Sequence, residues 1–453
     1  MLLNWRTLAD SDFNCSAGRE GGQVVQKATC FGRELRRRRL AAGLTLTALS
    51  NRVHYSKAQL SKVERDLKSP SRDLGRLCDS VLGAGGELMA LIPVRPKDAK
   101  APRTSDEEDV WLMALSGNGQ SWFQPLSRRQ LMSMGVAASV GMNIGHPETT
   151  SLVGDATLLA ASRTLFDNYR QFGQAASPGA LLPALIAQTH SLRDLSVRTG
   201  VGTRDGLLRL ASRYAEYAGW MMQEIGNDQG ALWWTRYAVE LAEAGGDHDL
   251  AAYGHVRHAL ITLYRDDAAQ TLDLARQAQG SKLPPRIRGL AAQREAQGHA
   301  LAGDYDACMR SLDRARALLT TPASQQDGPP VIGTTNLPDP VGMITGWCLY
   351  DLGRPREAAE VISGQLALVP PHALRTRVRY GIRRALAHAM AGEIEHACEL
   401  TDRLLPAAAT VSSATIATDM RALVRTLSRH PKNAAVRRVA PELSTALQVI
   451  ISK

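Results

Sequence analysis

Apolar residues recur at helical spacing through most of this chain. From about Ser151 to the C-terminus, amphipathic stretches of about 15 to 20 residues follow one another, with short breaks that contain Gly, Asp or Pro. A period of three to four residues places the apolar side chains on one face of a helix, whereas a strand needs strict alternation. The pattern predicts an all-α protein.

A shorter helical pattern occupies residues 33–70. Two brief apolar-periodic stretches are joined there by a tight turn, and Ser56 is a good N-cap for the second stretch. This is the pattern of a helix-turn-helix, whose second helix enters the major groove of DNA. We expect Ala48, Leu49 and Val53 to pack the first helix, and Leu60 and Val63 to form the buried stripe of the second.

The charge distribution agrees with DNA binding. Between Lys27 and Lys97 there are fifteen Lys and Arg and six Asp and Glu, a net charge of +9, while the whole chain carries +10. A concentrated positive charge is typical of a surface that binds phosphates. The run of four arginines at 36–39 could by itself be a solvated helix face. Beside a helix-turn-helix pattern, phosphate binding is the better interpretation.

Residues 39–64, RLAAGLTLTALSNRVHYSKAQLSKVE, resemble the DNA-binding domain of the Cro/C1-type repressors, the XRE family, and the resemblance extends over residues 31–92. It implies a small five-helix domain, double-stranded DNA as a partner, and an ion pair between Arg39 and Glu64. Base-edge contacts would come from Lys57, Ala58 and Lys62. The complete set expected at the DNA-binding site is Arg39, Lys57, Ala58, Gln59, Ser61, Lys62 and Lys68.

Three positions depart from that family's pattern. Leu46 stands where Gln often contacts a phosphate, and His54 and Asp66 stand where Gly is usual. His and Asp are among the residue types that tolerate a left-handed backbone. These departures affect the expected affinity rather than the assignment of the motif.

The region from residue 151 contains a recurring unit: a helix with a small residue in mid-face, a turn with Gly, and a second helix with a small residue near its start. The turns contain Gly226, Gly303, Gly353 and Gly392, and the small residues that follow are Ala231, Cys308, Ala358 and Ala397. The unit resembles a tetratricopeptide repeat (TPR), although its spacing near 40 exceeds the ideal 34. HEAT-like helical pairs are the alternative. Both imply an α-solenoid with a concave binding face.

The TPR resemblance places the first helix of each pair along the concave groove. Aromatic, Arg and Gln side chains on these helices suit a peptide or a small mixed apolar and polar ligand. Each Trp could instead fill the core. The ligand-binding candidates are Arg213, Glu216, Trp220, Gln223, Tyr253, Arg257, Gln293, Gln297, Trp347, Tyr350 and Arg379.

Other features narrow the class of protein. We find no nucleophile elbow, Walker loop, dinucleotide fingerprint or zinc-protease motif, so we expect no enzymatic activity and no cofactor. His255 and His258 lack a further ligand at helical spacing, so no metal site is expected. The six cysteines are scattered without paired spacing, which favours a protein of the reducing cytoplasm. In a bacterial cell, we expect the protein to associate with the nucleoid when it binds DNA.

The expected organisation has four parts. Residues 1–28 form a disordered N-terminal extension, 29–93 the helix-turn-helix domain, 94–150 a linker and connector, and 151–453 the TPR-like repeats. Residues 127–145 resemble a twin-arginine export signal, but such signals lie at an N-terminus and this apolar run is too short to span a bilayer. We expect it to be a helix packed on the repeats, with no membrane contact.

Two functions fit these observations. The first is a cytoplasmic transcriptional regulator, acting as a homodimer, whose repeats sense a peptide, small molecule or partner. The second is a protein-interaction scaffold or anti-regulator with a weak or vestigial DNA-binding domain, which Leu46 and His54 would favour. The sequence leaves open the operator, the effector, and whether the effect is activation or repression.

Overall fold

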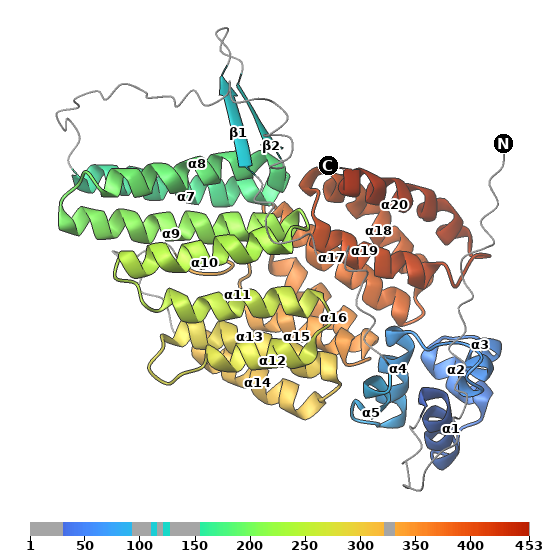
Figure 1. Ribbon diagram of the computed structural model, residues 1–453. Coiled ribbons are helices and arrows are strands. Elements are labelled where there is room, and N and C mark those ends of the chain that lie inside the picture. The colour runs from blue at the N-terminus through green and yellow to red at the C-terminus, as the bar shows by residue number, and fades with distance from the viewer. Residues whose placement is uncertain (1–29, 93–109, 116–120, 127–154, 321–330, 453) are drawn as a thin grey trace, which may run out of the picture.

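The computed structural model describes residues 30–92, 110–115, 121–126, 155–320 and 331–452. A small helical domain lies against one edge of a large helical solenoid (Figure 1). The expectations for residues 1–28 and 127–145 fall outside the described residues. No helix of the described residues is long and apolar enough to cross a membrane.

The small domain contains five helices, as expected. Its centre is apolar, with Leu35, Leu49, Leu60 and Leu88 fully buried. Three of the helices begin at a Thr or Ser whose hydroxyl accepts a backbone N–H of the first turn, which satisfies a donor that has no partner within the helix. The helices are α1 (Phe31–Ala41), α2 (Leu46–Val53), α3 (Lys57–Glu64), α4 (Arg72–Leu82) and α5 (Glu87–Ala90).

A two-stranded antiparallel hairpin follows, which the helical periodicity did not predict. Strand β1 (Val110–Leu115) pairs with β2 (Ser121–Leu126), with Val110 opposite Leu126 and Leu115 opposite Ser121. A signal was present in the sequence, because two apolar runs with Trp and Phe flank a short stretch rich in Gly and Asn, SGNGQ. The described part of the chain is therefore all-α apart from this hairpin.

The remaining helices form antiparallel pairs that stack into a superhelix. They are α7 (Asp155–Ala175), α8 (Pro178–Ser196), α9 (Val201–Glu224), α10 (Asp228–Ala244), α11 (Leu250–Tyr264), α12 (Ala268–Gln277), α13 (Pro285–Ala302), α14 (Tyr305–Leu319), α15 (Pro340–Asp351), α16 (Pro355–Leu368), α17 (Leu374–Met390), α18 (Ile394–Val411), α19 (Ala414–Leu427) and α20 (Ala434–Ser452).

The small residues of the repeat unit lie where paired helices approach closely. Ala231, Cys308, Ala358 and Ala397 are all fully buried. A side chain at Gly346 of α15 would meet Ile362 of α16 at 2.5 Å, so this helix pair needs glycine there. The prediction of an α-solenoid with close contacts at these positions is confirmed.

The superhelix closes on itself. Arg375 at the start of α17 donates to the backbone carbonyl of Gly173 at the end of α7 over 2.8 Å, and to Glu224 at the end of α9 over 2.8 Å. Thr376 also bonds to Gln174. The sixth helix pair is thereby joined to the first and second pairs, about 150 to 200 residues away in sequence, around the concave face.

Candidate DNA-binding surface and ligand cavity

Helix α3 presents a polar face to solvent. Ser56 caps it by accepting the Gln59 backbone N–H at 3.2 Å, and Leu60 and Val63 turn inward. Of the residues expected to meet DNA, four are exposed and two partly so. Lys57, Ala58, Lys62 and Lys68 are exposed, and Gln59 and Ser61 are intermediate.

Arg39 is not on that surface. Its Nε and Nη2 donate to the two carboxylate oxygens of Glu64 at 2.6 and 2.8 Å, and its Nη1 donates to the Leu44 carbonyl at 2.8 Å. Arg39 is only 7% exposed and Glu64 8%. The ion pair is as the resemblance implied, and it encloses the Arg39 guanidinium, which was also expected at the DNA-binding surface, inside the domain. It ties α1 to the end of α3.

The three departures from the family's pattern are accommodated locally. His54 ends α2 in the left-handed region with φ of 53°, and Asp66 takes φ of 58° after α3. Leu46 packs against the core of the domain. The turn between α2 and α3 therefore forms without glycine.

The helix-turn-helix domain is docked on the turns of the solenoid, and α4 and α5 form its docking side (Figure 1). Gly353, in the turn after α15, has φ of +74°, and a side chain there would meet the Arg76 carbonyl at 2.3 Å. Gly303, in the turn after α13, lies against the backbone of Gly86. Backbone thus packs on backbone, which leaves no room for a side chain at either turn.

Charged and aromatic contacts reinforce this docking. The Arg76 guanidinium of α4 lies 3.4 Å from Asp351 at the end of α15 and 5.9 Å from the Tyr350 ring. Burial alone would lower the pKa of Arg76, but the nearby Asp351, Tyr350, Asp73 and Asp266 raise this pKa above its ordinary value. At another point of this contact, Arg429, which follows α19, lies 4.4 Å over the ring of Tyr55, the residue after His54.

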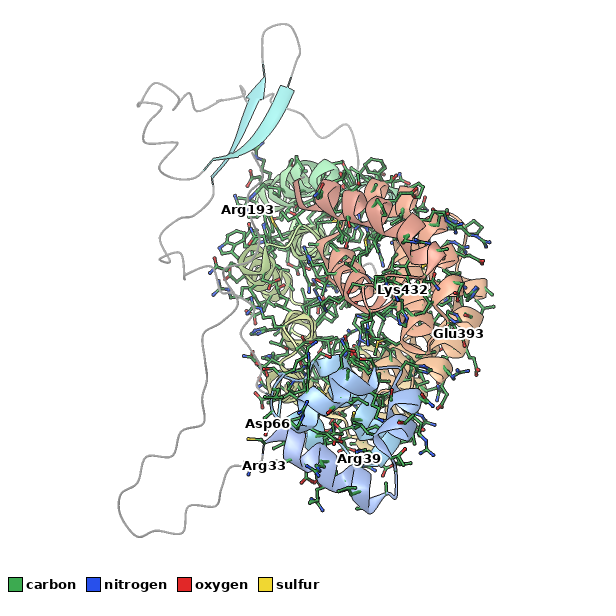
Figure 2. The ribbon with its side chains drawn as sticks, turned by 90° about the vertical axis from the view of Figure 1, so that its right-hand side faces the viewer. Arg33, Arg39, Asp66, Arg193, Glu393 and Lys432 are labelled. Atoms are coloured by element: carbon green, nitrogen blue, oxygen red, sulfur yellow. The ribbon has the colours of Figure 1, made fainter. Side chains whose placement is uncertain are left out.

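The turn between α17 and α18 also reaches the domain. A side chain at Gly392 would meet the His54 ring at 2.8 Å, so this turn and the end of α2 touch. Figure 2 shows Glu393 and Lys432 on the part of the solenoid that lies above the helix-turn-helix domain in that view. His54, one of the family departures, therefore contacts the solenoid.

A cavity of about 170 Å³ lies on the concave face of the solenoid. One water needs roughly 10–15 Å³ by this measure, so the cavity can hold a small organic ligand. Its walls come from α7, α9, α11, α13, α15 and α17, the first helices of successive pairs, and from residues 331–337. This is the groove that the TPR resemblance assigned to the ligand.

Eight of the eleven predicted ligand residues line this cavity: Arg213, Glu216, Trp220, Tyr253, Arg257, Gln293, Trp347 and Arg379. The other three lie elsewhere. Gln223 accepts from Arg257 at 3.3 Å and Gln297 from Arg294 at 2.6 Å, so both brace cavity residues from behind. Tyr350 faces Arg76 instead. It lies three residues after Trp347 on α15, so its side chain points about 60° away from the direction of the Trp347 side chain.

The sequence reasoning missed several cavity residues. Arg170 of α7 donates to the carbonyls of Val331 and Gly333, which fixes the segment that covers one side of the cavity. Arg294 and Arg375 also line it. A signal existed for Arg294, which follows Gln293 on the same helix, but none for Arg170, because its partners lie more than 160 residues away.

Glu224 of α9 connects this helix to α17 through its carboxylate. Burial alone would raise the pKa of its carboxyl, but Arg379, Arg375 and the hydroxyls of Ser413 and Thr415 lower the pKa to about 2. Arg375 Nη1 lies 2.8 Å from its Oε2, and the Thr415 hydroxyl donates to Oε1 at 2.9 Å. This carboxylate is charged at neutral pH and holds the closed superhelix together.

Helix α15 joins the cavity to the docked domain. Trp347 lines the cavity, and its ring stacks under Arg383 at 3.2 Å. Asp351 follows four residues later on the same helix; burial raises the pKa of its carboxyl, and Arg76, Arg383 and the Trp347 side chain lower it. Asp351 in turn pairs with Arg76 of α4. A side chain in the ligand cavity is therefore separated from the helix-turn-helix domain by one carboxylate.

The comparisons with known proteins support the assignment of the small domain. The sequence model of a protein family described as a helix-turn-helix domain matches residues 31–92. No curated protein matches the chain. A crystal structure of a Rap protein complexed with competence and sporulation factor is similar at 17% identity, over 65% of this chain and 88% of that chain, with a TM-score of 0.38. That likeness is too weak to carry an argument.

Residues 31–92 therefore form an XRE-like helix-turn-helix domain, and a solenoid of helical repeats follows it. The match covers the segment that the sequence resemblance indicated. Domains of this class are built to place one helix in the major groove of DNA.

Proposed function

We propose that this protein is a DNA-binding transcriptional regulator whose solenoid senses a ligand in the concave cavity. The observation that carries the proposal is the path through α15, from Trp347 in the cavity to Asp351 and Arg76 at the docked domain. A ligand can change DNA binding only if it binds two arrangements of the protein unequally. A ligand that shifts α15 changes the contact that holds the domain.

The alternative, a scaffold with a vestigial DNA-binding domain, is less well supported. The polar face of α3 is open to solvent, and the two departures that favoured a vestigial domain each make a packing contact in the folded protein. Leu46 packs against the core, and His54 contacts the Gly392 turn.

The decisive experiment is selection of bound sequences from a random DNA pool by the full-length protein, followed by salt titration of the selected operator. We expect one sequence to be enriched and its affinity to fall steeply with salt, as phosphate contacts require. If no sequence is enriched, the scaffold is the better interpretation.

Coupling is tested with Asp351→Asn, a change outside the DNA-facing surface. Loss of the carboxylate should alter operator affinity by about 0.5–2 kcal/mol, the usual effect of substitutions that lie between two coupled sites. Glu360→Gln on the exposed face of α16 is the matched control. Equal affinities for all three proteins would mean that docking and DNA binding are independent.

Dimerisation is part of the proposal. One helix-turn-helix contacts a short half-site, and two half-sites one DNA turn apart give higher affinity and specificity. The solenoid offers the larger surface for the contact. Sedimentation of the full chain at micromolar concentration, free and with operator DNA, should show a dimer. A monomer in both conditions would contradict it.

A further inference from the structure

The ligand cavity has a large excess of positive charge. Among the described residues, six arginines line it, Arg170, Arg213, Arg257, Arg294, Arg375 and Arg379, against one carboxylate, that of Glu216. Outside the lining, Asp247 pairs with Arg213 at 2.7 Å, and Glu224 pairs with both Arg375 and Arg379. Six guanidinium groups and three carboxylates leave a net charge of +3 at these nine groups.

Arg294 is the centre of this excess. It lies on α13, facing the cavity, and within the described part of the chain its guanidinium donates to the neutral amide of Gln297 at 2.6 Å. No carboxylate of the described residues pairs with it. Burial lowers the pKa of its guanidinium, yet arginine keeps its charge in proteins. A poorly hydrated cation without a counter-ion is costly, and an anion beside it removes that cost.

Other buried hydrogen-bond donors in the cavity also indicate a ligand with acceptor groups. The Gln293 amide nitrogen and the Nε of Arg379 are buried and have no hydrogen-bond partner among the described residues. The Nε of Arg257 also makes no hydrogen bond there, although it forms an ion pair with a Glu216 oxygen 3.3 Å away. All three residues line the cavity, and Gln293 is 2% exposed. Buried polar atoms are normally satisfied, so a group of donors without acceptors indicates a ligand that supplies acceptors.

Much of the remaining wall is apolar, beside a few uncharged polar residues such as Gln174 and Asn336. Trp220, Tyr253, Ile344 and Trp347 line the same cavity, and neither Trp220 nor Trp347 carries a charge that an anion could use. A fully hydrated inorganic ion would leave these surfaces without a partner. An apolar body attached to the anion would bury them.

We propose that the cavity binds an amphipathic anion, in which a carboxylate or phosphate meets Arg294, Gln293 and Arg257 and an aromatic or aliphatic body packs on the tryptophans. This inference rests on the proposed ligand-sensing function and specifies its ligand class. The anionic group could belong to a free organic acid, a phosphate ester or the C-terminus of a short peptide.

Matched pairs of probes test the charge requirement on the full-length protein. The probes are 3-phenylpropionate with 3-phenylpropionamide, phenyl phosphate with phenol, and acetyl-Leu-Phe as free acid and as amide, each titrated by calorimetry. At least one anion should bind about tenfold or more tightly than its neutral analogue, as a charge-assisted hydrogen bond requires. The pair that shows this preference identifies the source of the anion. Equal binding within every pair, or no binding by any anion, would overturn the proposal.

Substitutions locate the anion. Arg294→Gln should remove the preference for the charged probe, while Arg294→Lys should keep part of it. Arg310→Gln, which removes an exposed charge from α14, is the control and should bind like the parent. Circular dichroism melts confirm that each variant folds. An unchanged preference in folded Arg294→Gln would refute the assignment of this residue.

Measuring operator affinity on the same samples tests the ligand class and the sensing function separately. If a neutral probe binds the cavity as well as its acid and also changes operator affinity, the sensing function stands and the anion assignment fails. If the anion binds through Arg294 but operator affinity does not respond, the ligand class stands and the sensing function fails.

Discussion

Arginine side chains serve different purposes in this protein, according to what surrounds them. Arg39 is enclosed with Glu64 inside the helix-turn-helix domain, and Arg76 docks that domain on the solenoid. Arg375 closes the superhelix through Glu224, and Arg294 faces the cavity. A guanidinium provides five donors in a fixed plane, which suits each of these multi-partner sites.

Replacing Arg39 with Ala should destabilise the helix-turn-helix domain by about 3–5 kcal/mol, because it leaves the Glu64 carboxylate buried without a partner. Chemical denaturation of an Arg39→Ala variant measures this. The double variant with Glu64→Gln should recover part of the loss, since the isolated charge is then gone. If Arg39→Ala lowers DNA affinity without lowering stability, the residue contacts DNA after all.

Replacing Lys62 with Ala should weaken operator binding by about 1–3 kcal/mol if its ammonium reads a base. Replacing Lys57 should lower affinity as well and reduce the salt dependence. Lys282→Ala, an exposed lysine between α12 and α13, is the control with the same loss of charge. Gel shifts at two salt concentrations give both quantities. Unchanged affinity in both α3 variants would remove this helix from the DNA contact.

At the level of elements, the turns between paired helices have a second role beyond reversing the chain. Those that contain Gly303, Gly353 and Gly392 lie along one edge of the solenoid and meet Gly86, Arg76 and His54 of the docked domain. Because these contacts involve backbone atoms, they fix the domain more closely than exposed side chains would.

Gly353→Ala should loosen the docking. The new methyl group would overlap the Arg76 carbonyl, and alanine is strained at φ of +74°. Double electron–electron resonance between spin labels at the exposed positions 51 and 360 should show a longer or broader distance distribution than the parent. Gly364→Ala, on the open face of α16 with no atom within 4 Å, is the control. An unchanged distribution in Gly353→Ala would mean that the turn does not position the domain.

For the whole molecule, one buried carboxylate, that of Glu224, contributes to closure of the superhelix beside the backbone contacts of Arg375. The pKa of Glu224 is about 2, below its ordinary value of 4.5, so its contribution is fully present above pH 4.5 and is lost as the pH falls toward 2. The shift corresponds to about 3 kcal/mol. The Glu224 carboxylate joins α9 to α17 and α19, and its partners lie 151 and 191 residues away in sequence.

Glu224→Gln should therefore lower the free energy of unfolding at neutral pH by about 3–5 kcal/mol, because two arginines lose their shared anion. The variant should also lose less stability than the parent between pH 4.5 and pH 2, since the titrating group is gone. Denaturation curves at several pH values check both effects. Parallel pH profiles for the two proteins would show that Glu224 does not control closure.

Local sequence determined the helices, the caps and the packing of neighbouring pairs. The Arg39–Glu64 pair forms as the resemblance to the XRE family implied. Ser56 caps α3, and Ala231 and its equivalents are buried as their spacing indicated. These features depend on residues close in sequence or on a repeat, so their period and residue type are sufficient to predict them. The hairpin was missed because its two runs are short and its turn signal was outweighed by the helical pattern around it.

Only the tertiary structure decided which side chains meet across the superhelix. Arg170, Arg375 and Glu224 find partners more than 150 residues away, and the curvature that brings them together is the sum of small rotations at every helix pair. The sequence by itself established a helix-turn-helix domain, a basic charge concentrated there, and a solenoid with a concave face. The docking of that domain, the burial of Arg39 and the charge of the cavity follow from long-range packing, which no local pattern records.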